Sequence, residues 1–145
     1  MAAILDPFPR VRLASLPTPL EPLPRLSKFL GGPRILVKRD DQTGLAMGGN
    51  KARKLEYLAA YALELGCDTL VTIGGLQSNH ARQTAAAAAR LGMACELVLP
   101  RVVTRSSEEY EQSGNVLLDR LLGARLRMLP AGQNPGDVIG NKAFR

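Results

Sequence analysis

Lys51 ends the run Gly48-Gly49-Asn50-Lys51, and this setting suggests chemistry for its amine. The two glycines let the backbone approach a ligand closely. A helix that begins here would present free N–H groups and a partial positive charge, which favour an anion. A lysine amine in such a place can attack an aldehyde as a nucleophile. On this pattern alone, a solvated pair formed by Lys51 and Lys54, one helical turn apart, is the more ordinary interpretation.

A second polar cluster, Gln77-Ser78-Asn79-His80, follows directly after an apolar run and opens an expected helix. A serine hydrolase is not indicated, because the sequence's single histidine lies two residues from Ser78 and no G-x-S-x-G elbow is present. Taken alone, His80 is as readily a surface or capping residue as a functional one. The cluster as a whole is more typical of a site that recognises a carboxylate and a ring.

The nearest competing motif at the first loop is a phosphate-binding P-loop, G-x-x-x-x-G-K-[ST]. Gly44 and Gly49 have the correct separation for it. However, Asn50 stands where the motif needs lysine, and Ala52 offers no hydroxyl for magnesium. The sequence therefore argues against nucleotide hydrolysis.

The composition bears on the class of protein and on its partners. The 145 residues are 46% hydrophobic and 22% charged, which is typical of a globular domain. The net charge of +6 invites a nucleic-acid hypothesis, but acidic residues are interleaved with the basic ones, and only three Tyr and three Phe are available for stacking. No apolar run approaches the roughly 20 residues that span a bilayer, and no signal peptide is recognisable. We therefore expect no nucleic-acid or membrane partner and a cytoplasmic location.

Metal binding is not expected, because one histidine and two cysteines outside a C-x-x-C pair do not make a zinc site. Cys67 and Cys95 both lie beside apolar, strand-like segments. Free cysteines in such places are usually small buried apolar residues, and we expect burial for both.

Hydrophobic periodicity indicates the elements that position the two loops. Helices are predicted at 51–65, with Asn50 as the N-cap, and at 79–91 and 108–122, each closed by a glycine; strands are predicted at 34–38, 69–73, 94–99 and 124–129. The proline-rich residues 1–33 predict an extended arm with one helical turn near 26–30, and residues 130–145 begin nothing long. The alternation predicts βαβ units and a mostly parallel sheet, whose ligands bind where strands lead into helices. Loops 44–50 and 74–79 both qualify.

Taken together, these motifs resemble the fold-type-II enzymes that depend on pyridoxal phosphate (PLP), and within them the D-cysteine desulfhydrase and 1-aminocyclopropane-1-carboxylate (ACC) deaminase group. The resemblance covers essentially the whole chain. It implies an α/β fold like that of the tryptophan synthase β-subunit, with an open, mostly parallel sheet flanked by helices in three layers. The matching motifs, in order, are Pro17-Thr18-Pro19-Leu20-Glu21, Lys38-Arg39-Asp40-Asp41, Gly48-Gly49-Asn50-Lys51, Arg53-Lys54-Leu55-Glu56, Gln77-Ser78-Asn79-His80, Arg82-Gln83 and Ser113-Gly114-Asn115.

The resemblance implies a set of cofactor contacts. The lysine matching Lys51 holds PLP as a Schiff base and, once released by the substrate, moves protons. The residue matching Asn79 bonds the cofactor's 3-hydroxyl oxygen. Asn50 and Lys54 are expected to help bind the cofactor, with Lys54 near its phosphate.

The resemblance also implies a substrate site. Ser78, a catalytic candidate, and its neighbours Gln77, Asn79 and His80 are expected to hold the carboxylate of a small amino acid. ACC deaminases tend to carry Gln where this chain has His80, whereas desulfhydrase-like members tend to carry His. The sequence therefore favours α,β-elimination from a D-cysteine-like amino acid, giving pyruvate, sulfide and ammonia. ACC deaminase and L-cysteate sulfo-lyase activities are the alternatives.

Members of this group are about twice as long as this chain. The resemblance implies that residues 1–52 belong to an incomplete large PLP domain and residues 53–145 to a small α/β domain, with the C-terminal half of the large domain missing. We therefore expect a truncated chain that is inactive alone, and a homodimer at full length. A non-catalytic fragment is the alternative to an enzyme.

Overall fold

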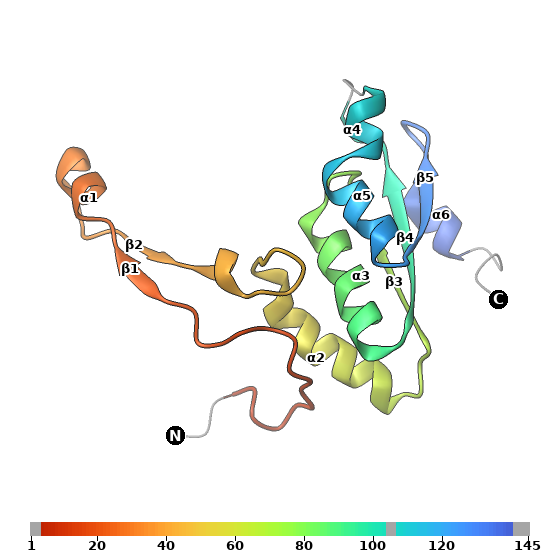
Figure 1. The fold of residues 1–145 in the computed structure, drawn as a ribbon, viewed down its shortest axis with the longest axis horizontal. Coiled ribbons are helices and arrows are strands. Elements are labelled where there is room, and N and C mark those ends of the chain that lie inside the picture. The colour runs from red at the N-terminus through yellow and green to blue at the C-terminus, as the bar shows by residue number, and fades with distance from the viewer. Residues whose placement is uncertain (1–3, 104–106, 141–145) are drawn as a thin grey trace.

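The computed structural model describes residues 4–103 and 107–140, which form an extended N-terminal arm, residues 4–50, and an α/β body (Figure 1). The body has a parallel sheet in the order β3-β4-β5, built from β3 (Thr69–Ile73), β4 (Ala94–Pro100) and β5 (Arg125–Leu129). Thr69 pairs with Ala94, and Glu96 pairs with Arg125. The predicted parallel sheet is confirmed, with strand bounds within one residue of those expected.

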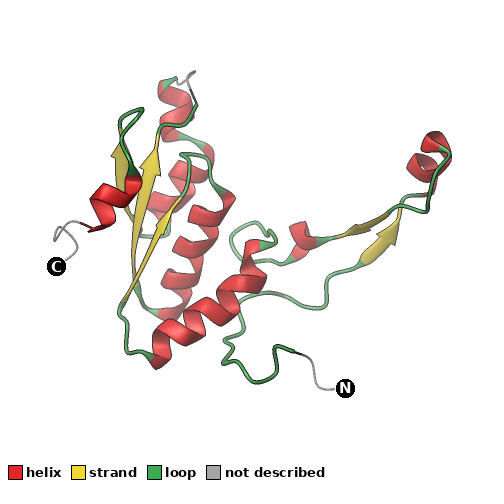
Figure 2. Ribbon diagram, turned by 180° about the vertical axis from the view of Figure 1, so that it is seen from behind, coloured by secondary structure: helices red, strands yellow, loops and turns green. Residues whose placement is uncertain are grey.

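Helices cover both faces of the sheet, so the body has three layers (Figure 2). Helices α3 (Asn79–Leu91) and α5 (Gly114–Leu121) lie on one face, and α6 (Pro135–Gly140) lies on the other. Helix α2 (Lys51–Glu64) packs against α3.

The core forms where α3 meets the middle strand. The alanine-rich sequence of α3 lets its backbone approach the sheet closely, and Ala81, Ala85 and Ala88 are fully buried there. Leu97 and Leu99 of β4 are also fully buried and belong to the same cluster. This packing fixes the start of α3, where the second polar cluster lies, relative to the sheet.

The predicted helix over 108–122 is wrong in one respect, because two helices occupy this range. Helix α4 (Glu108–Gln112) ends at Ser113, whose φ of −104° and ψ of −175° are extended, and α5 then begins at Gly114 with a φ of +59°. The break has a physical cause that lies far away in sequence. The side chain of Gln77 bonds backbone groups at the break, as described below.

The N-terminal arm contains a small antiparallel pair, of which the sequence predicted one strand, at 34–38, but not its partner. Strand β1 (Leu20–Pro22) pairs with β2 (Leu36–Lys38), and α1 (Pro24–Leu30) lies between them. Strand β1, with three residues, is too short to leave an alternating pattern, and α1 is longer than the single turn expected. A short 3₁₀ helix, η1 (Asp40–Gln42), leads from β2 into the loop before Lys51.

The two cysteines differ. Cys95 in β4 is buried as predicted, and burial raises the pKa of its thiol to about 12. The same prediction is wrong for Cys67, which is exposed because it lies in the turn between α2 and β3. Within residues 4–103 and 107–140, no helix is long and apolar enough to cross a membrane.

Candidate active site

Two glycines shape the turn that leads into Lys51. Gly48 has a φ of +77° and Gly49 a φ of +136°, which side chains rarely tolerate. A Cβ atom on Gly48 would lie 1.8 Å from the carbonyl oxygen of Asp41, and one on Gly49 would lie 2.6 Å from Oε1 of Gln83. The turn is therefore packed against backbone on one side and against α3 on the other.

A buried threonine fastens this turn to the arm. Thr43 is fully buried, and its hydroxyl accepts a hydrogen bond from the backbone N–H of Gly49 at 2.8 Å. The same hydroxyl donates to the carbonyl oxygen of Gly49 at 2.9 Å. The Gly49 N–H also donates to the carbonyl of Asp40 at 2.9 Å.

Two polar residues of α3 hold the same turn from the other side. Arg82 donates from its guanidinium to the carbonyl oxygen of Gly48 at 2.9 Å, and Gln83 donates from Nε2 to that of Gly49 at 3.1 Å. Both side chains come from the buried part of α3. They tie the Lys51 loop to the helix that carries the second polar cluster.

Asp119 of α5 lies behind Arg82. It is fully buried, and neither carboxylate oxygen has a hydrogen-bond partner. Burial raises the pKa of Asp119 to about 7, although the positive charge of Arg82 acts in the opposite direction. Burial also lowers the pKa of Arg82, which Asp119 opposes. The arginine that holds the turn before Lys51 thus lies within reach of the charge of a buried carboxyl whose pKa is raised to about 7.

Lys51 is the first residue of α2 and is half-buried. Its Nζ donates to Oδ1 of Asn50 at 3.1 Å. The predicted capping role of Asn50 is wrong: Asn50 has helical angles, with φ of −67° and ψ of −17°, and its side chain bonds no backbone N–H of the helix. The Asn50 oxygen is turned toward the Lys51 amine instead.

His80 is close enough to Lys51 and Lys54 for their charges to act on it. Its Nε2 lies 2.9 Å from the hydroxyl of Thr72, and its Nδ1 lies 3.5 Å from that of Thr84. Burial lowers the pKa of His80, and the positive charges of Lys54 and Lys51 lower it further. Protonation of the imidazole is thereby disfavoured, and the charge effects place His80 near the Lys51 end of α2.

Ser78 caps α3, because its Oγ accepts a hydrogen bond from the N–H of Ala81 at 3.3 Å. A capping hydroxyl that accepts in this way keeps its hydrogen available to donate elsewhere.

The neighbouring amides are bonded to the α4–α5 break. Gln77 donates from Nε2 to the carbonyls of Tyr110 at 2.6 Å and Ser113 at 3.1 Å, and its Oε1 accepts from the N–H of Asn115 at 2.8 Å. Asn115 in turn donates from Nδ2 to the carbonyl of Gln77 at 2.8 Å and to Oδ1 of Asn79 at 3.1 Å. Gln77 is thus engaged with backbone, while Asn79 is exposed.

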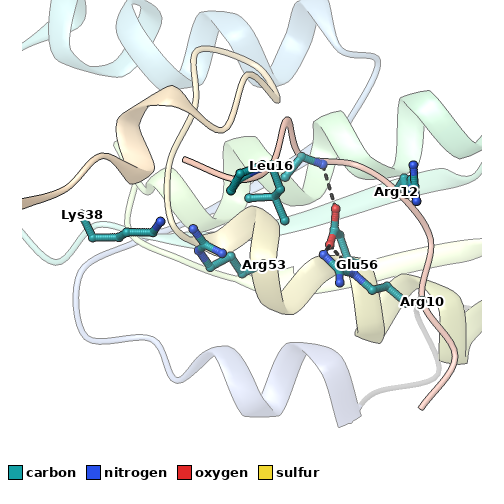
Figure 3. A pocket seen from close by; sticks show the side chains of 8 residues that line it. Arg10, Arg12, Leu16, Lys38, Arg53 and Glu56 are labelled. Carbon is teal, nitrogen blue, oxygen red and sulfur yellow. Dashed lines mark hydrogen bonds and ion pairs between the residues drawn. The ribbon is translucent and has the colours of Figure 1, made fainter. Parts of the chain in front are cut away.

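A basic hollow beside α2 is a different place. Arg10, Arg12, Lys38, Arg53 and Glu56 are among the residues that line a pocket of roughly 610 Å³ between the arm and α2, and neither Lys51 nor residues 77–80 line it. Figure 3 shows Arg10 against Glu56, with Lys38 and Arg53 pointing toward one another.

Glu56 anchors the arm at this pocket. Its fully buried carboxylate accepts hydrogen bonds from the N–H groups of Leu13 at 3.0 Å and Ala14 at 2.9 Å, and from Nε of Arg10 at 2.7 Å. Burial acts to raise the pKa of Glu56, but these bonds outweigh it and the pKa is lowered. The charges of this pocket serve to fasten the arm.

Comparison with known proteins now decides the family. The model of the family described as "Pyridoxal-phosphate dependent enzyme" matches residues 11–141. The chain belongs to this family. Its cofactor is therefore the predicted one, pyridoxal phosphate.

Within this family, the chain is similar to curated D-cysteine desulfhydrases. The chain is 52% identical over 141 residues to a D-cysteine desulfhydrase of Klebsiella pneumoniae strain 342, covering 97% of this chain and 43% of that protein. A D-cysteine desulfhydrase of Salmonella paratyphi B is also 52% identical, with the same coverage. The chain thus spans less than half the length of these relatives.

Solved structures agree with the fold. A crystal structure described as an ACC deaminase homologue matches with a TM-score of 0.79 and 41% identity, over 93% of this chain and 39% of that one. A diaminopropionate ammonia lyase of Escherichia coli matches with a TM-score of 0.55 and 23% identity, over 86% of this chain and 36% of that one, which supports the fold alone. The predicted fold-type-II architecture is confirmed.

The donor set around Lys51 fits the family's cofactor. Lys51 offers a primary amine for an aldehyde, Lys54 a cation for a phosphate, and Asn79 an exposed amide for a ring oxygen. Within the described residues, the ion pairs of the chain include neither Lys51 nor Lys54. Donors that are not neutralised by acids suit an anionic ligand.

Motif matching alone did not assign roles to Arg82, Gln83 or Asn115. All three occur in matched motifs, and each has a sequence signal: Arg82 and Gln83 interrupt the apolar run of a buried helix, and Asn115 follows a glycine at a helix start. Their partners, however, lie more than 30 residues away.

Proposed function

We propose that Lys51 binds pyridoxal phosphate covalently and that the whole protein catalyses α,β-elimination from a D-cysteine-like amino acid, giving pyruvate, sulfide and ammonia. The observation that carries the proposal is the fastening of the Gly48–Gly49 turn to α3 by Arg82 and Gln83. This fastening brings Lys51 to the same edge of the sheet as residues 77–80. Identity of 52% to D-cysteine desulfhydrases supports the choice of substrate class.

Each residue has a role that its surroundings favour. The cofactor, when bound, supplies an electron sink for the carbanion formed by loss of the substrate's α-proton. The Lys51 amine accepts that proton, and the Ser78 hydroxyl, capping α3 through its oxygen, donates its hydrogen to the substrate carboxylate. Lys54 would hold the phosphate of the cofactor, and Asn79 would donate to its 3-oxygen.

His80 favours sulfide elimination over the alternatives. Its imidazole is bonded to Thr72 and Thr84, and burial together with the charges of Lys54 and Lys51 lowers its pKa, which disfavours a third cation beside these two lysines. ACC deaminase activity is the second candidate, because the matching crystal structure is described as a homologue of that enzyme. L-cysteate sulfo-lyase activity is a third.

Spectroscopy and turnover test the proposal together. The 145-residue chain is mixed with pyridoxal phosphate, and the absorbance band of covalently bound cofactor is expected to form and to vanish in Lys51→Ala. Lys28→Ala, a change in α1 of the arm, is the matched control and should keep the band. A Lys51→Ala variant that keeps the band would contradict the assignment of Lys51.

Sulfide release from D-cysteine then separates an enzyme from a non-catalytic fragment. We propose that the 145-residue chain alone binds cofactor but releases no sulfide, and that a chain of the relatives' full length does. ACC and L-cysteate, tested in parallel, distinguish the three activities. The division into a large-domain segment, residues 1–52, and a small domain, residues 53–145, likewise remains a proposal, as do the homodimer and the cytoplasmic location.

A further inference from the structure

Three side-chain amides, those of Gln77, Asn115 and Asn79, lie together where α3 and α5 begin. The Gln77 and Asn115 side chains each bond the backbone of the other residue, and the Asn115 amide also bonds the Asn79 amide. An amide oxygen only accepts and an amide nitrogen only donates, so the orientation of each amide depends on neighbours with a fixed role. Backbone groups have such roles, because a carbonyl only accepts and an N–H only donates. The orientation of an amide that bonds the backbone is therefore fixed, and it fixes in turn the orientation of an amide bonded to it.

Backbone groups alone fix the first amide. Nε2 of Gln77 donates to the carbonyls of Tyr110 and Ser113, and Oε1 accepts from the N–H of Asn115. A reversed amide would face its oxygen toward two carbonyls and its nitrogen toward a donor. The close approach needs Gly114, since a Cβ there would lie 2.6 Å from Oε1 of Gln77.

The Asn115 amide is oriented separately, by a backbone carbonyl, and it in turn orients the Asn79 amide. The backbone carbonyl of Gln77 can only accept, so the Asn115 atom 2.8 Å away must be Nδ2. The second hydrogen of that nitrogen points to Oδ1 of Asn79 at 3.1 Å. Asn79 is thus held by its oxygen, and its Nδ2 is the end that remains for a ligand.

We propose that Asn115 is a positioning residue that orients the Asn79 amide, so that Asn79 presents a donor and not an acceptor to the ligand. The matching ligand group is an anionic or phenolic oxygen, such as the 3-oxygen of pyridoxal phosphate. The opposite orientation would turn the Asn79 oxygen toward the ligand oxygen, so that two acceptors would face each other, and would set two donors together at Asn115. The choice of ligand rests on the function proposed above, whereas the amide orientation belongs to the chain itself.

The orientation is tested without any cofactor. Asn115→Asp keeps the size and the backbone N–H that bonds Gln77, but its carboxylate can only accept. Asn79 is then expected to turn and donate Nδ2 to the new carboxylate, shifting its side-chain ¹H–¹⁵N cross-peaks in the ligand-free chain. Asn134→Asp, the same change in an exposed turn, is the control. Unchanged Asn79 cross-peaks in Asn115→Asp would overturn the inference.

Cofactor retention tests the consequence. In equilibrium dialysis, the dissociation constant for pyridoxal phosphate should rise by roughly tenfold or more in Asn115→Asp, because a donor to a charged oxygen is lost. The effect should disappear in an Asn79→Ala background, whereas a merely structural role of Asn115 would weaken binding equally in both backgrounds and would refute positioning. If Asn115→Asp folds poorly, Asn115→Ala carries the same cycle. A parent chain that retains no cofactor refutes the proposed function, while the cross-peaks still decide the orientation.

Discussion

Two neighbouring regions at the start of α2, the basic pocket around Glu56 and the helix start at Lys51, use positive charge in opposite ways. At the basic pocket, Arg10 pairs with Glu56 and Arg53 pairs with Asp40, so the charges hold the arm against the helix. At the helix start, Lys51 bonds only an amide oxygen of its neighbour in the described contacts. The basic pocket is therefore a joint between the arm and α2, and the polar edge at Lys51 is the candidate for chemistry.

The difference also lies in how each region is held. The joint depends on one buried carboxylate, that of Glu56, and on the arm residues that donate hydrogen bonds to it. The Lys51 turn depends instead on glycines and on side chains from another helix. If this comparison is correct, damage to the joint should cost stability and leave Lys51 reactive. Damage to the turn should lower the stability of the chain and also abolish the reactivity of Lys51.

Gly48→Ala should have the largest effect, because the new Cβ would lie 1.8 Å from a backbone carbonyl at a φ of +77°. We expect a loss of about 3 kcal/mol or more in the free energy of unfolding, together with loss of cofactor attachment at Lys51. Urea denaturation and the bound-cofactor absorbance measure the two effects. Gly32→Ala, where the nearest atom would be 3.9 Å away, is the control and should change neither.

Glu56→Ala should come next, because it leaves the N–H groups of Leu13 and Ala14 without their acceptor. We expect a loss of about 2–3 kcal/mol in unfolding free energy, with Lys51 still reactive. Glu64→Ala, in the last turn of the same helix and exposed, is the control. Loss of cofactor attachment in a folded Glu56→Ala chain would break the proposed separation of joint and site.

The pH dependence of the joint follows from the same contacts. The pKa of Glu56 is lower in the folded state than its ordinary value of 4.5. Its contribution is therefore present above that value and is lost as the pH falls through the folded pKa. Wild-type stability at acid pH should fall more steeply than that of Glu56→Ala.

Asp119→Asn should change the pH dependence of stability in the opposite sense to Glu56→Ala. Its folded pKa of about 7 lies above the ordinary 3.8, so the stability it contributes is present below about pH 4 and lost as the pH rises to 7. The variant should show a flatter decline in unfolding free energy between pH 4 and 7. Arg82 and Cys95 face this carboxyl and remain in the variant. Asp68→Asn is the exposed control, and a wild-type slope in Asp119→Asn would contradict this account.

The predictable part of the molecule was local. Alternating apolar runs and closing glycines indicated α2, α3 and the three parallel strands, because these elements depend on short-range periodicity. The break at Ser113 was not predictable, because it is stabilised by Gln77, 36 residues away. The site shows the same division: Lys51 and residues 77–80 stand out by motif, whereas Asn115 acquires its role only from contacts made across the fold.

The covalent attachment point tests the central claim most directly. The 145-residue chain is incubated with pyridoxal phosphate, reduced with borohydride, digested and mapped by mass spectrometry. We predict that the pyridoxyl group is found on Lys51, with Lys28, Lys38 and Lys54 unmodified at stoichiometric cofactor. Modification spread over several lysines, or absent from Lys51, would contradict it.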